Sequence, residues 1–431
     1  MTDVRFNKTP RIYYGWIIVG LSFFTMGFQV FARYGFSIFQ VPLIAEFGWN
    51  RGTLSGAFAL SLLSYAIAVP FMGSLLEKKG PRAVLPWGPV LAGFAMLFGY
   101  FVNSLLHIYI LMGLLVGLAI PISGFATQSA IIPRWFLKKR GRAVGMSVVA
   151  GAGFGVLVLS PITERLIALF GWRHAYLILG FFILLVLVPA NFLLMRNRPD
   201  DVGQARDGNP LQERDELPPL SMGNKTDQGV RKVFHSVKND KKFRLFVLFG
   251  LLLGFQANTI LSHLHLYLVD SGYNTATAAL LFGSVGFLRA VSGTAMGWVS
   301  DLIGRGRGGA LSAIIAATGV GVLLLLPLFG GGIFAGIVFV LIYGTGAGGL
   351  SVCYSSLAGD LFEGPRFGVI MGFFEICYAL GGVVGSPLAG YTFDHTGSYV
   401  FPFILIILGT LLSTFVILRL APSRNAQNPV S

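Results

Sequence analysis

Two isolated charges in otherwise apolar stretches are the residues best placed to do chemistry. Arg289 is the only charged residue in 276–300, and Glu375 is the only one in 367–393. About 20 mostly apolar residues suffice to cross a bilayer as a helix, so each charge falls near the middle of a predicted membrane helix. An arginine at that depth costs about 2.5–3.5 kcal/mol on insertion scales. Both side chains are therefore expected to face a water-filled cavity or a partner charge.

Arg289 and Glu375 each have two interpretations. The guanidinium fork of Arg289 matches the two oxygens of a carboxylate and keeps its charge at any working pH, which predicts a substrate clamp. The alternative for Arg289 is a structural ion pair between helices, with Glu375 as its permanent partner. Glu375 is otherwise a candidate proton carrier, because acids at membrane depth commonly belong to proton relays.

Uncharged polar side chains could shape a site around these charges. Tyr378 lies three residues after Glu375 and therefore on the same helix face. The expected substrate-binding residues are Arg289, Tyr378, Tyr343, Cys377, Gln29 and Tyr34. The commoner role of a glutamine at membrane depth is a hydrogen bond between helices, and that of an aromatic residue is packing.

Three further ionisable residues lie toward predicted helix ends. His263 and His265 are spaced by two and point about 200° apart on a helix, so they cannot share a metal ion. His263 is a second candidate proton carrier, because histidine changes charge near neutral pH; the alternative is a histidine at the outer surface. Arg33 falls near the outer end of a first helix predicted over 13–36, where it can snorkel or attract anions at the entrance.

The composition defines the elements that must hold these residues. Of 431 residues, 54% are hydrophobic and 12% charged, against about 25% charged in soluble domains. The apolar residues form blocks long enough to span a bilayer, which predicts an all-α membrane protein. The net charge is +14, but the basic residues lie in short connections and tails, as cytoplasmic loops do. This placement argues against a nucleic-acid partner.

The sequence indicates no cofactor and no metal. Cys353 and Cys377 lie inside apolar segments and imply neither a disulfide framework nor a zinc site. The GxGxxG pattern at 344–349 has no predicted strand before it, so we discard a dinucleotide site. Walker, HExxH and nucleophile-elbow patterns are absent. We therefore do not expect an enzyme.

The apolar blocks predict twelve transmembrane helices in two pseudo-symmetric bundles. Residues 1–195 form the first six-helix bundle, 196–242 a polar and proline-rich cytoplasmic linker, and 243–431 the second bundle with a cytoplasmic tail. The strongest clusters of Lys and Arg lie in every second connection, which places both termini and the linker inside. We expect a multi-pass, monomeric protein of the cell (inner) membrane.

An internal repeat supports this division. GSLLEKKGPR from Gly73 echoes GWVSDLIGRGR from Gly297, GRAVG from Gly141 echoes GVIMG from Gly368, and a turn at Gly171 echoes one at Gly397. The offset is nearly constant, about 225 residues, which argues for two halves related by duplication. The pairs Gly151–Gly155 and Gly381–Gly385 fit GxxxG and predict close helix packing.

The repeated loops resemble the signature of the major facilitator superfamily. Its positions here are Gly73, Glu77 and Arg82 in the first copy, and Gly297, Asp301 and Arg305 in the second. A glycine lets two helices approach closely, while an acid can cap a helix end and pair with arginines across a cytoplasmic gate. The first copy departs from the pattern with Glu77 in place of aspartate, which keeps the charge.

A narrower resemblance rests on three stretches. WFLKKRGRAVG at 135–145, running into AGAG at 150–153, is similar to the monocarboxylate transporter signature. YGW at 14–16 and EFGW at 46–49 resemble bacterial members of that family and the related oxalate–formate antiporters. The resemblance implies alternating access, a small carboxylate substrate often moved with a proton, and a carboxylate-binding arginine in helix eight, where Arg289 lies.

The departures from that family narrow the expected substrate. No aspartate lies one helical turn from Arg289, and Tyr34 and Gly35 stand where animal members place a lysine in helix one. Tyr378 stands where oxalate carriers have a second cation on helix eleven. A monoanion is therefore favoured over a dianion such as oxalate.

We thus expect a secondary transporter of small organic monocarboxylates, proton-coupled, working by alternating access. Arg289 would neutralise the carboxylate, and Glu375 or His263 would carry the proton. The alternatives are an organic anion exchanger of the oxalate/formate type, an exporter of unrelated compounds, and a membrane sensor that transports nothing. The partners would be the carboxylate, the proton and the lipid bilayer.

Overall fold

The computed structural model describes residues 13–208, 239–362 and 367–421, and these contain helices and no strands. Eleven continuous helical stretches are long and apolar enough to cross a membrane. They are Tyr14–Phe47, Arg51–Lys79, Pro81–Gly99, Leu105–Trp135, Arg140–Leu194, Lys241–Asp270, Thr275–Ile303, Arg305–Phe329, Ile333–Leu361, Ile370–Thr396 and Val400–Leu420. Both predicted tails and most of the predicted linker lie outside the described residues.

One stretch holds two membrane helices. Arg140–Leu194 has 55 residues, about 82 Å of helix at 1.5 Å per residue, against a hydrocarbon core of about 30 Å. Gly171 interrupts it with φ 79° and ψ 160°, a conformation that glycine adopts without a Cβ clash. The chain turns back there, as predicted. The described part therefore has twelve membrane helices, and the expected fold class is confirmed.

Most of the first six spans are divided into consecutive helical pieces of unequal length. They are α1 (Tyr14–Tyr34), α2 (Phe36–Phe47), α3 (Arg51–Lys79), α4 (Pro81–Val84), α5 (Trp87–Gly99), α6 (Leu105–Ile108), η1 (Tyr109–Val116), α7 (Gly117–Ser123), α8 (Phe125–Trp135), α9 (Arg140–Val144), η2 (Gly145–Val149), α10 (Ala150–Phe182), η3 (Ile183–Leu187) and α11 (Val188–Leu194). Two 3₁₀ turns follow in the linker, η4 (Pro199–Val202) and η5 (Arg206–Gly208).

Each of the last six spans consists mainly of one continuous helix. They are α13 (Lys241–Asp270), α14 (Thr275–Ile303), α15 (Arg305–Leu325) with η6 (Leu326–Phe329), α16 (Ile333–Leu361), α17 (Phe367–Thr396) and α18 (Val400–Leu420). Side-chain caps fix two of their starts. The Asp240 carboxylate accepts the Lys242 N–H at 2.8 Å, and the Asn274 amide oxygen accepts the Thr277 N–H at 2.8 Å, each satisfying a free donor of the first turn.

The predicted end of the first membrane helix was wrong. We expected it to end near residue 36, but α2 continues it to Phe47, and Gly48 ends it with φ 64°. The segment FSIFQVPLIAEF carries one charge in twelve residues, so it stays apolar enough to remain helical. Arg33 therefore lies well inside the span and not near its outer end.

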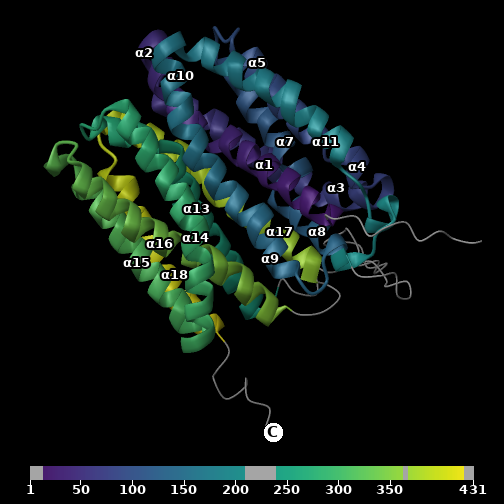
Figure 1. Cartoon of the computed structure of the whole chain (residues 1–431). Coiled ribbons are helices and arrows are strands. Elements are labelled where there is room, and N and C mark those ends of the chain that lie inside the picture. Colours follow the sequence, from purple (N-terminus) through teal and green to yellow (C-terminus); the bar gives the residue numbers. More distant parts are fainter. Residues whose placement is uncertain (1–12, 209–238, 363–366, 422–431) are drawn as a thin grey trace, which may run out of the picture.

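Figure 1 shows the helices before the linker, coloured purple to teal, gathered on one side, and those after it, green to yellow, on the other. The two groups meet where α3 packs against α17 and α10 packs against α14. We call the end of the bundle that carries residues 80, 136–139, 195–208 and 304 the linker end. The opposite end, with 48–50, 171, 271–274 and 397–399, is the far end.

Glycines let the helices within each group approach closely. A Cβ on Gly151 would lie 2.5 Å from the Phe23 carbonyl oxygen, and one on Gly381 would collide with the Leu251 carbonyl oxygen. The close packing predicted from the two GxxxG pairs is therefore confirmed.

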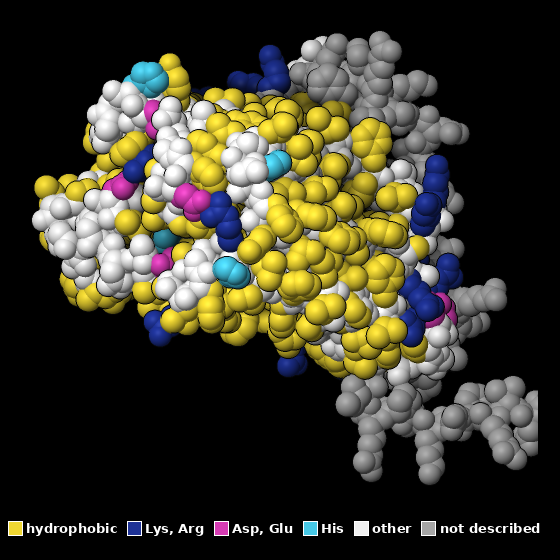
Figure 2. All heavy atoms as spheres, turned by 90° about the horizontal axis from the view of Figure 1, so that it is seen from above, with side chains coloured by type: hydrophobic (Ala, Val, Ile, Leu, Met, Phe, Trp, Pro, Cys, Tyr) yellow, Lys and Arg dark blue, Asp and Glu magenta, His cyan; other side chains and the backbone are white. Residues whose placement is uncertain are grey.

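The outer surface suits a lipid environment. Figure 2 shows a broad area of hydrophobic side chains that contains few charged groups. Large apolar side chains such as Leu185, 70% exposed, and Phe334, 78% exposed, contribute to the surface. Spanning structures must also satisfy their backbone polar groups internally, as these helices do.

Candidate substrate-binding site

A cavity of about 430 Å³ lies between the two groups of helices, within the usual size range for small-molecule sites. Its wall is formed by residues from α1, α3, α7, α8, η2, α10, α13, α14, α16 and α17. It extends toward the linker end, because Ser355 and Met371 line it near the linker ends of α16 and α17. Three charged side chains line the cavity: Arg33, Arg289 and Glu375.

Arg289 projects from α14 into a ring of hydroxyl groups. The hydroxyls of Tyr34, Tyr343 and Tyr378 lie within electrostatic reach of its guanidinium. Neighbouring amides orient two of these tyrosines. Tyr34 donates its hydroxyl to Asn258 Oδ1 at 3.2 Å, and the Tyr343 hydroxyl accepts from Gln256 Nε2 at 2.9 Å.

Arg289 has no carboxylate partner in the described part of the chain. The four ion pairs found there are Arg51–Asp270, Arg173–Glu46, Arg305–Asp301 and Arg305–Asp360. The geometry therefore does not support a permanent ion pair between Arg289 and Glu375. Both residues line the same cavity, and Tyr378 lies within electrostatic reach of each.

Glu375 contacts the opposite group of helices. Its Oε2 accepts a hydrogen bond from the Tyr65 hydroxyl of α3 at 3.0 Å. The Arg33 guanidinium carbon lies 4.9 Å from the centroid of the Tyr65 ring, within the range of a cation–π contact. The neighbours of Glu375 therefore include Tyr65 and, beyond it, Arg33.

Tyr65 is a site residue that was not predicted from the sequence, and Arg33, predicted near the outer end of its helix as an anchor or an anion-attracting residue at the entrance, lies in the cavity wall. Arg33 is 8% exposed, and its Nε and Nη2 have no hydrogen-bond partner among the described residues. The continuation of the apolar block beyond residue 36 could have placed Arg33 at depth. Tyr65 has no signal of its own, because a tyrosine inside a membrane helix usually packs.

The other expected site residues have different surroundings. Gln29 lines the cavity and donates from Nε2 to Ser123 Oγ at 2.7 Å. Tyr34 and Tyr378 also line it. Tyr343 is fully buried behind the wall, and Cys377 is half-buried and not a wall residue.

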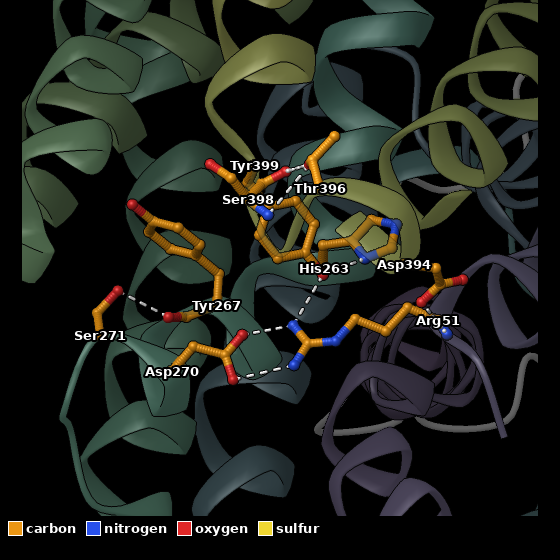
Figure 3. A network of polar contacts seen from close by, with 9 residues as sticks. All are labelled: Arg51, His263, Tyr267, Asp270, Ser271, Asp394, Thr396, Ser398 and Tyr399. Atoms are coloured by element: carbon orange, nitrogen blue, oxygen red, sulfur yellow. Dashed lines mark hydrogen bonds and ion pairs between the residues drawn. The ribbon is translucent and has the colours of Figure 1, made fainter. Parts of the chain in front are cut away.

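His263 lies outside the cavity in a polar network at the far end (Figure 3). Its Nε2 lies 2.9 Å from the Ser386 carbonyl oxygen, and its Nδ1 lies 3.1 Å from the Tyr399 hydroxyl. A carbonyl only accepts, so we assign the proton to Nε2 and let Nδ1 accept from Tyr399. His265 points elsewhere, with Nε2 3.3 Å from the Thr275 carbonyl oxygen.

Arg51 is the centre of this network. Its guanidinium forms a two-pronged pair with Asp270, with 3.0 Å between Nη2 and Oδ1, and Nη1 donates to the Tyr399 hydroxyl at 3.2 Å. Its Cζ lies 3.6 Å from the Phe393 ring centroid. Burial raises the pKa of the Tyr399 hydroxyl well above its usual range, so this hydroxyl stays protonated at neutral pH.

Asp394 completes the network by capping α3. Its Oδ1 accepts the Arg51 backbone N–H at 2.9 Å, and its Oδ2 accepts the Gly52 N–H at 2.7 Å. A carboxylate at a helix N-terminus satisfies free donors and complements the helix dipole. We call Arg51, Asp270, Asp394, Tyr399 and His263 the far-end latch, because they join α3 to α13, α17 and the start of α18.

The predicted gate loops lie at the linker end. The Arg305 guanidinium pairs with Asp301 at 2.6 Å and with Asp360 at 3.3 Å. All three belong to the last six helices, so this pairing does not cross between the two groups. Asp301 is 57% exposed, and such surface pairs contribute little to stability. In the first copy, Glu77 lies in the last turn of α3, which ends at Lys79 just before Gly80, whose φ is 77°.

The sequence pattern of the Major Facilitator Superfamily matches residues 19–363. The match covers well over half of the chain, and the twelve-helix fold agrees with it. The chain therefore belongs to this superfamily. It is a multi-pass membrane transporter and not an enzyme, as the sequence predicted.

Several of its relatives within the superfamily are monocarboxylate transporters. Monocarboxylate transporter 13 of Rattus norvegicus is 25% identical over 406 residues, which cover 93% of this chain and 88% of that protein. Monocarboxylate transporter 11 of Homo sapiens is 28% identical, covering 91% and 80%. Monocarboxylate transporter 2 of Homo sapiens is 26% identical, covering 90% and 81%. The predicted resemblance is confirmed.

Proposed function

We propose that this transporter moves small organic monocarboxylates together with a proton, by alternating access. The observation that carries the proposal is Arg289, which lines the cavity between the two helix groups and has no carboxylate partner among the described residues. A guanidinium can bind both oxygens of a carboxylate and compensate its lost hydration. The names of the relatives, which are monocarboxylate transporters, agree with this substrate class.

The residues around Arg289 suit a small anion. Tyr378 and Tyr34 present hydroxyl groups at the cavity wall, and Tyr343 lies behind them. We propose that Tyr378 shares the carboxylate with Arg289, and that Gln29 contacts the other end of the substrate from α1. Cys377, beside Tyr378 in α17, would contribute to the packing behind the site.

Glu375 is the proposed proton carrier. It lines the same cavity as Arg289, whereas His263 is held in the far-end latch. An ionised Glu375 accepts the Tyr65 hydroxyl, and a protonated one could donate in turn. Because Tyr65 and Glu375 belong to different helix groups, a change in the proton on Glu375 alters a contact between the two groups.

The proposed transport cycle rests on a difference between the two ends of the molecule. The far end is held by the latch, while the cavity extends toward the linker end. We propose that the linker end and both termini face the cytoplasm of a cell inner membrane. Residues 1–195 and 243–431 would then rock about the cavity as two units, joined by 196–242, within a monomer.

Substrate uptake with simultaneous pH recording tests this function. Proteoliposomes would receive lactate, pyruvate, acetate, formate or oxalate in turn, with the internal pH followed by a trapped dye. We expect uptake of at least one monocarboxylate, accompanied by internal acidification in the wild type. The variant Glu375→Gln should retain binding and lose the proton flux. Electrogenic uptake without any proton flux would contradict the proposed coupling.

A further inference from the structure

The proposed function leaves one charged wall residue unused. Of the three charged side chains in the cavity wall, Arg289 binds the carboxylate and Glu375 carries the proton, but Arg33 has no role. Arg33 is 8% exposed, and its Nε and Nη2 lack partners among the described residues. A buried donor without an acceptor is costly, more so on a charged group. The orphaned guanidinium therefore points to a ligand oxygen or to a nearby compensating charge.

Glu375 supplies that compensating charge through Tyr65. The Tyr65 ring lies 4.9 Å from the Arg33 guanidinium carbon, and the Tyr65 hydroxyl donates to Glu375 at 3.0 Å. Arg33 and Glu375 therefore contact the same tyrosine, Arg33 at the ring and Glu375 at the hydroxyl. They form no direct ion pair in the described part of the chain, so the guanidinium keeps free donors.

The net charge of the cavity wall depends on whether Glu375 is ionised. With Glu375 ionised, the two arginines and one carboxylate leave a single net positive charge, and the free cation is Arg289. Without the negative charge of Glu375 the wall carries two positive charges. Arg33 then becomes a second group with free N–H donors for an anion, and two separated guanidinium groups suit a molecule with two carboxylates.

We infer that Glu375 and Arg33 together determine the charge of the substrate that the cavity accepts. In the state that first binds the anion, before Glu375 takes up the proton, ionised Glu375 offsets Arg33 and selects a monoanion. Removal of the Glu375 charge by substitution converts this binding state into a dicarboxylate site. This inference rests on the proposed role of Arg289 as the carboxylate-binding residue. It adds a specificity-determining pair, Arg33 and Glu375, to that site.

Ligand binding to the full-length protein tests the inference. Purified wild type and variants in detergent would be titrated at one neutral pH with pyruvate, lactate and acetate as monoanions and malonate as a dianion. We expect Glu375→Gln to raise the affinity for malonate, relative to that for the best monoanion, by at least about tenfold. Glu164→Gln is the matched control, because Glu164 is a buried glutamate of α10 outside the cavity wall.

The Arg33 variants separate a charge effect from a structural one. Arg33→Gln alone leaves no net charge in the wall, so monoanion affinity should fall by about tenfold. Arg33→Lys should retain it. The double variant Arg33→Gln/Glu375→Gln restores one net positive charge, so it should regain monoanion affinity and lose the gain for malonate. A merely structural role predicts no such rescue.

The outcomes distinguish this inference from the proposed function. An unchanged malonate preference in Glu375→Gln, or a gain that persists in the double variant, overturns the inference while leaving Arg289 as the anion-binding residue. If Glu375→Gln aggregates, Arg33→Gln decides on its own, and an unchanged monoanion affinity in that variant overturns the inference. A wild type that binds none of the three monoanions overturns both.

Discussion

Arg51 in the far-end latch and Arg289 in the cavity are both largely enclosed by the helices, but their neighbours differ. Arg51 has a two-pronged carboxylate partner in Asp270, a hydroxyl acceptor in Tyr399 and an aromatic face in Phe393. Arg289 has tyrosine hydroxyls around it and no carboxylate partner among the described residues.

The difference indicates two uses of the same side chain. A guanidinium whose donors are satisfied within the protein stabilises the conformation that brings its partners together, because removing either partner leaves a charge uncompensated. A guanidinium without an anionic partner keeps its binding capacity for a ligand. The latch is thus expected to govern conformation, and the cavity arginines to govern affinity.

Replacement of Arg289 should have the largest effect on substrate binding. We expect Arg289→Gln to lower monocarboxylate affinity by about 100-fold, because a charged pair with the substrate is worth about 2–5 kcal/mol when truncated. The melting temperature of Arg289→Gln should stay near that of the wild type or rise, since no carboxylate in the described part of the chain loses a partner. Titration calorimetry and thermal unfolding of the purified protein would measure both.

The conservative variant sharpens this expectation. Arg289→Lys keeps the charge but loses the two-pronged geometry, so its affinity should lie between those of the wild type and Arg289→Gln. Unchanged affinity in Arg289→Lys would show that Arg289 does not clamp a carboxylate.

Replacement of Arg51 should mainly shift the conformation. The guanidinium and the Asp270 carboxylate are 13% and 32% exposed, so their loss should favour opening of the far end by about 1–3 kcal/mol. A cysteine at Leu261, a wall residue on α13, would report this opening in a background without Cys353 and Cys377. An impermeant thiol reagent applied from the far end should label it about tenfold faster or more in Arg51→Gln.

Arg173→Gln provides the control at the same end of the molecule. It removes an ion pair of 2.7 Å with Glu46, but both partners belong to the first six helices. Labelling at position 261 should therefore match that of the wild type. Equal acceleration in both variants would mean that the latch has no special role in closure.

The smallest expected effect concerns the Tyr399 hydroxyl and pH. Burial raises its pKa in the fold, whereas an unfolded tyrosine titrates near pH 10. The folded protein thus keeps a proton that the unfolded chain releases, so this contribution is complete below about pH 10 and declines as the pH rises toward the folded pKa. The melting-temperature difference between wild type and Tyr399→Phe should shrink as the pH passes about 10.

A neighbouring tyrosine serves as the control for this measurement. Tyr391 is 61% exposed and lies outside the latch, so Tyr391→Phe should melt close to the wild type. A difference between wild type and Tyr399→Phe that stays constant across this pH range would contradict the assigned role of the hydroxyl.

The residues predicted from sequence share one property: each carries a polar group inside an apolar helix, where such a group is rare. Arg289 and Glu375 were found in this way, and both line the cavity. Tyr65 is no more conspicuous in sequence than any other membrane tyrosine, although its hydroxyl contacts Glu375. Arg33 was placed near a helix end because the first span was predicted too short.

The sequence by itself determined the membrane location, the helical fold class, the superfamily and the two charges at depth. These follow from local composition and spacing, because the cost of placing polar groups in lipid acts on each segment separately. Only the tertiary structure decided which of these charges have partners. Arg51 meets Asp270 and Asp394 from distant segments, while Arg289 and Glu375 line one cavity without pairing. Such pairing depends on the packing of α3, α13, α14 and α17, which no single segment encodes.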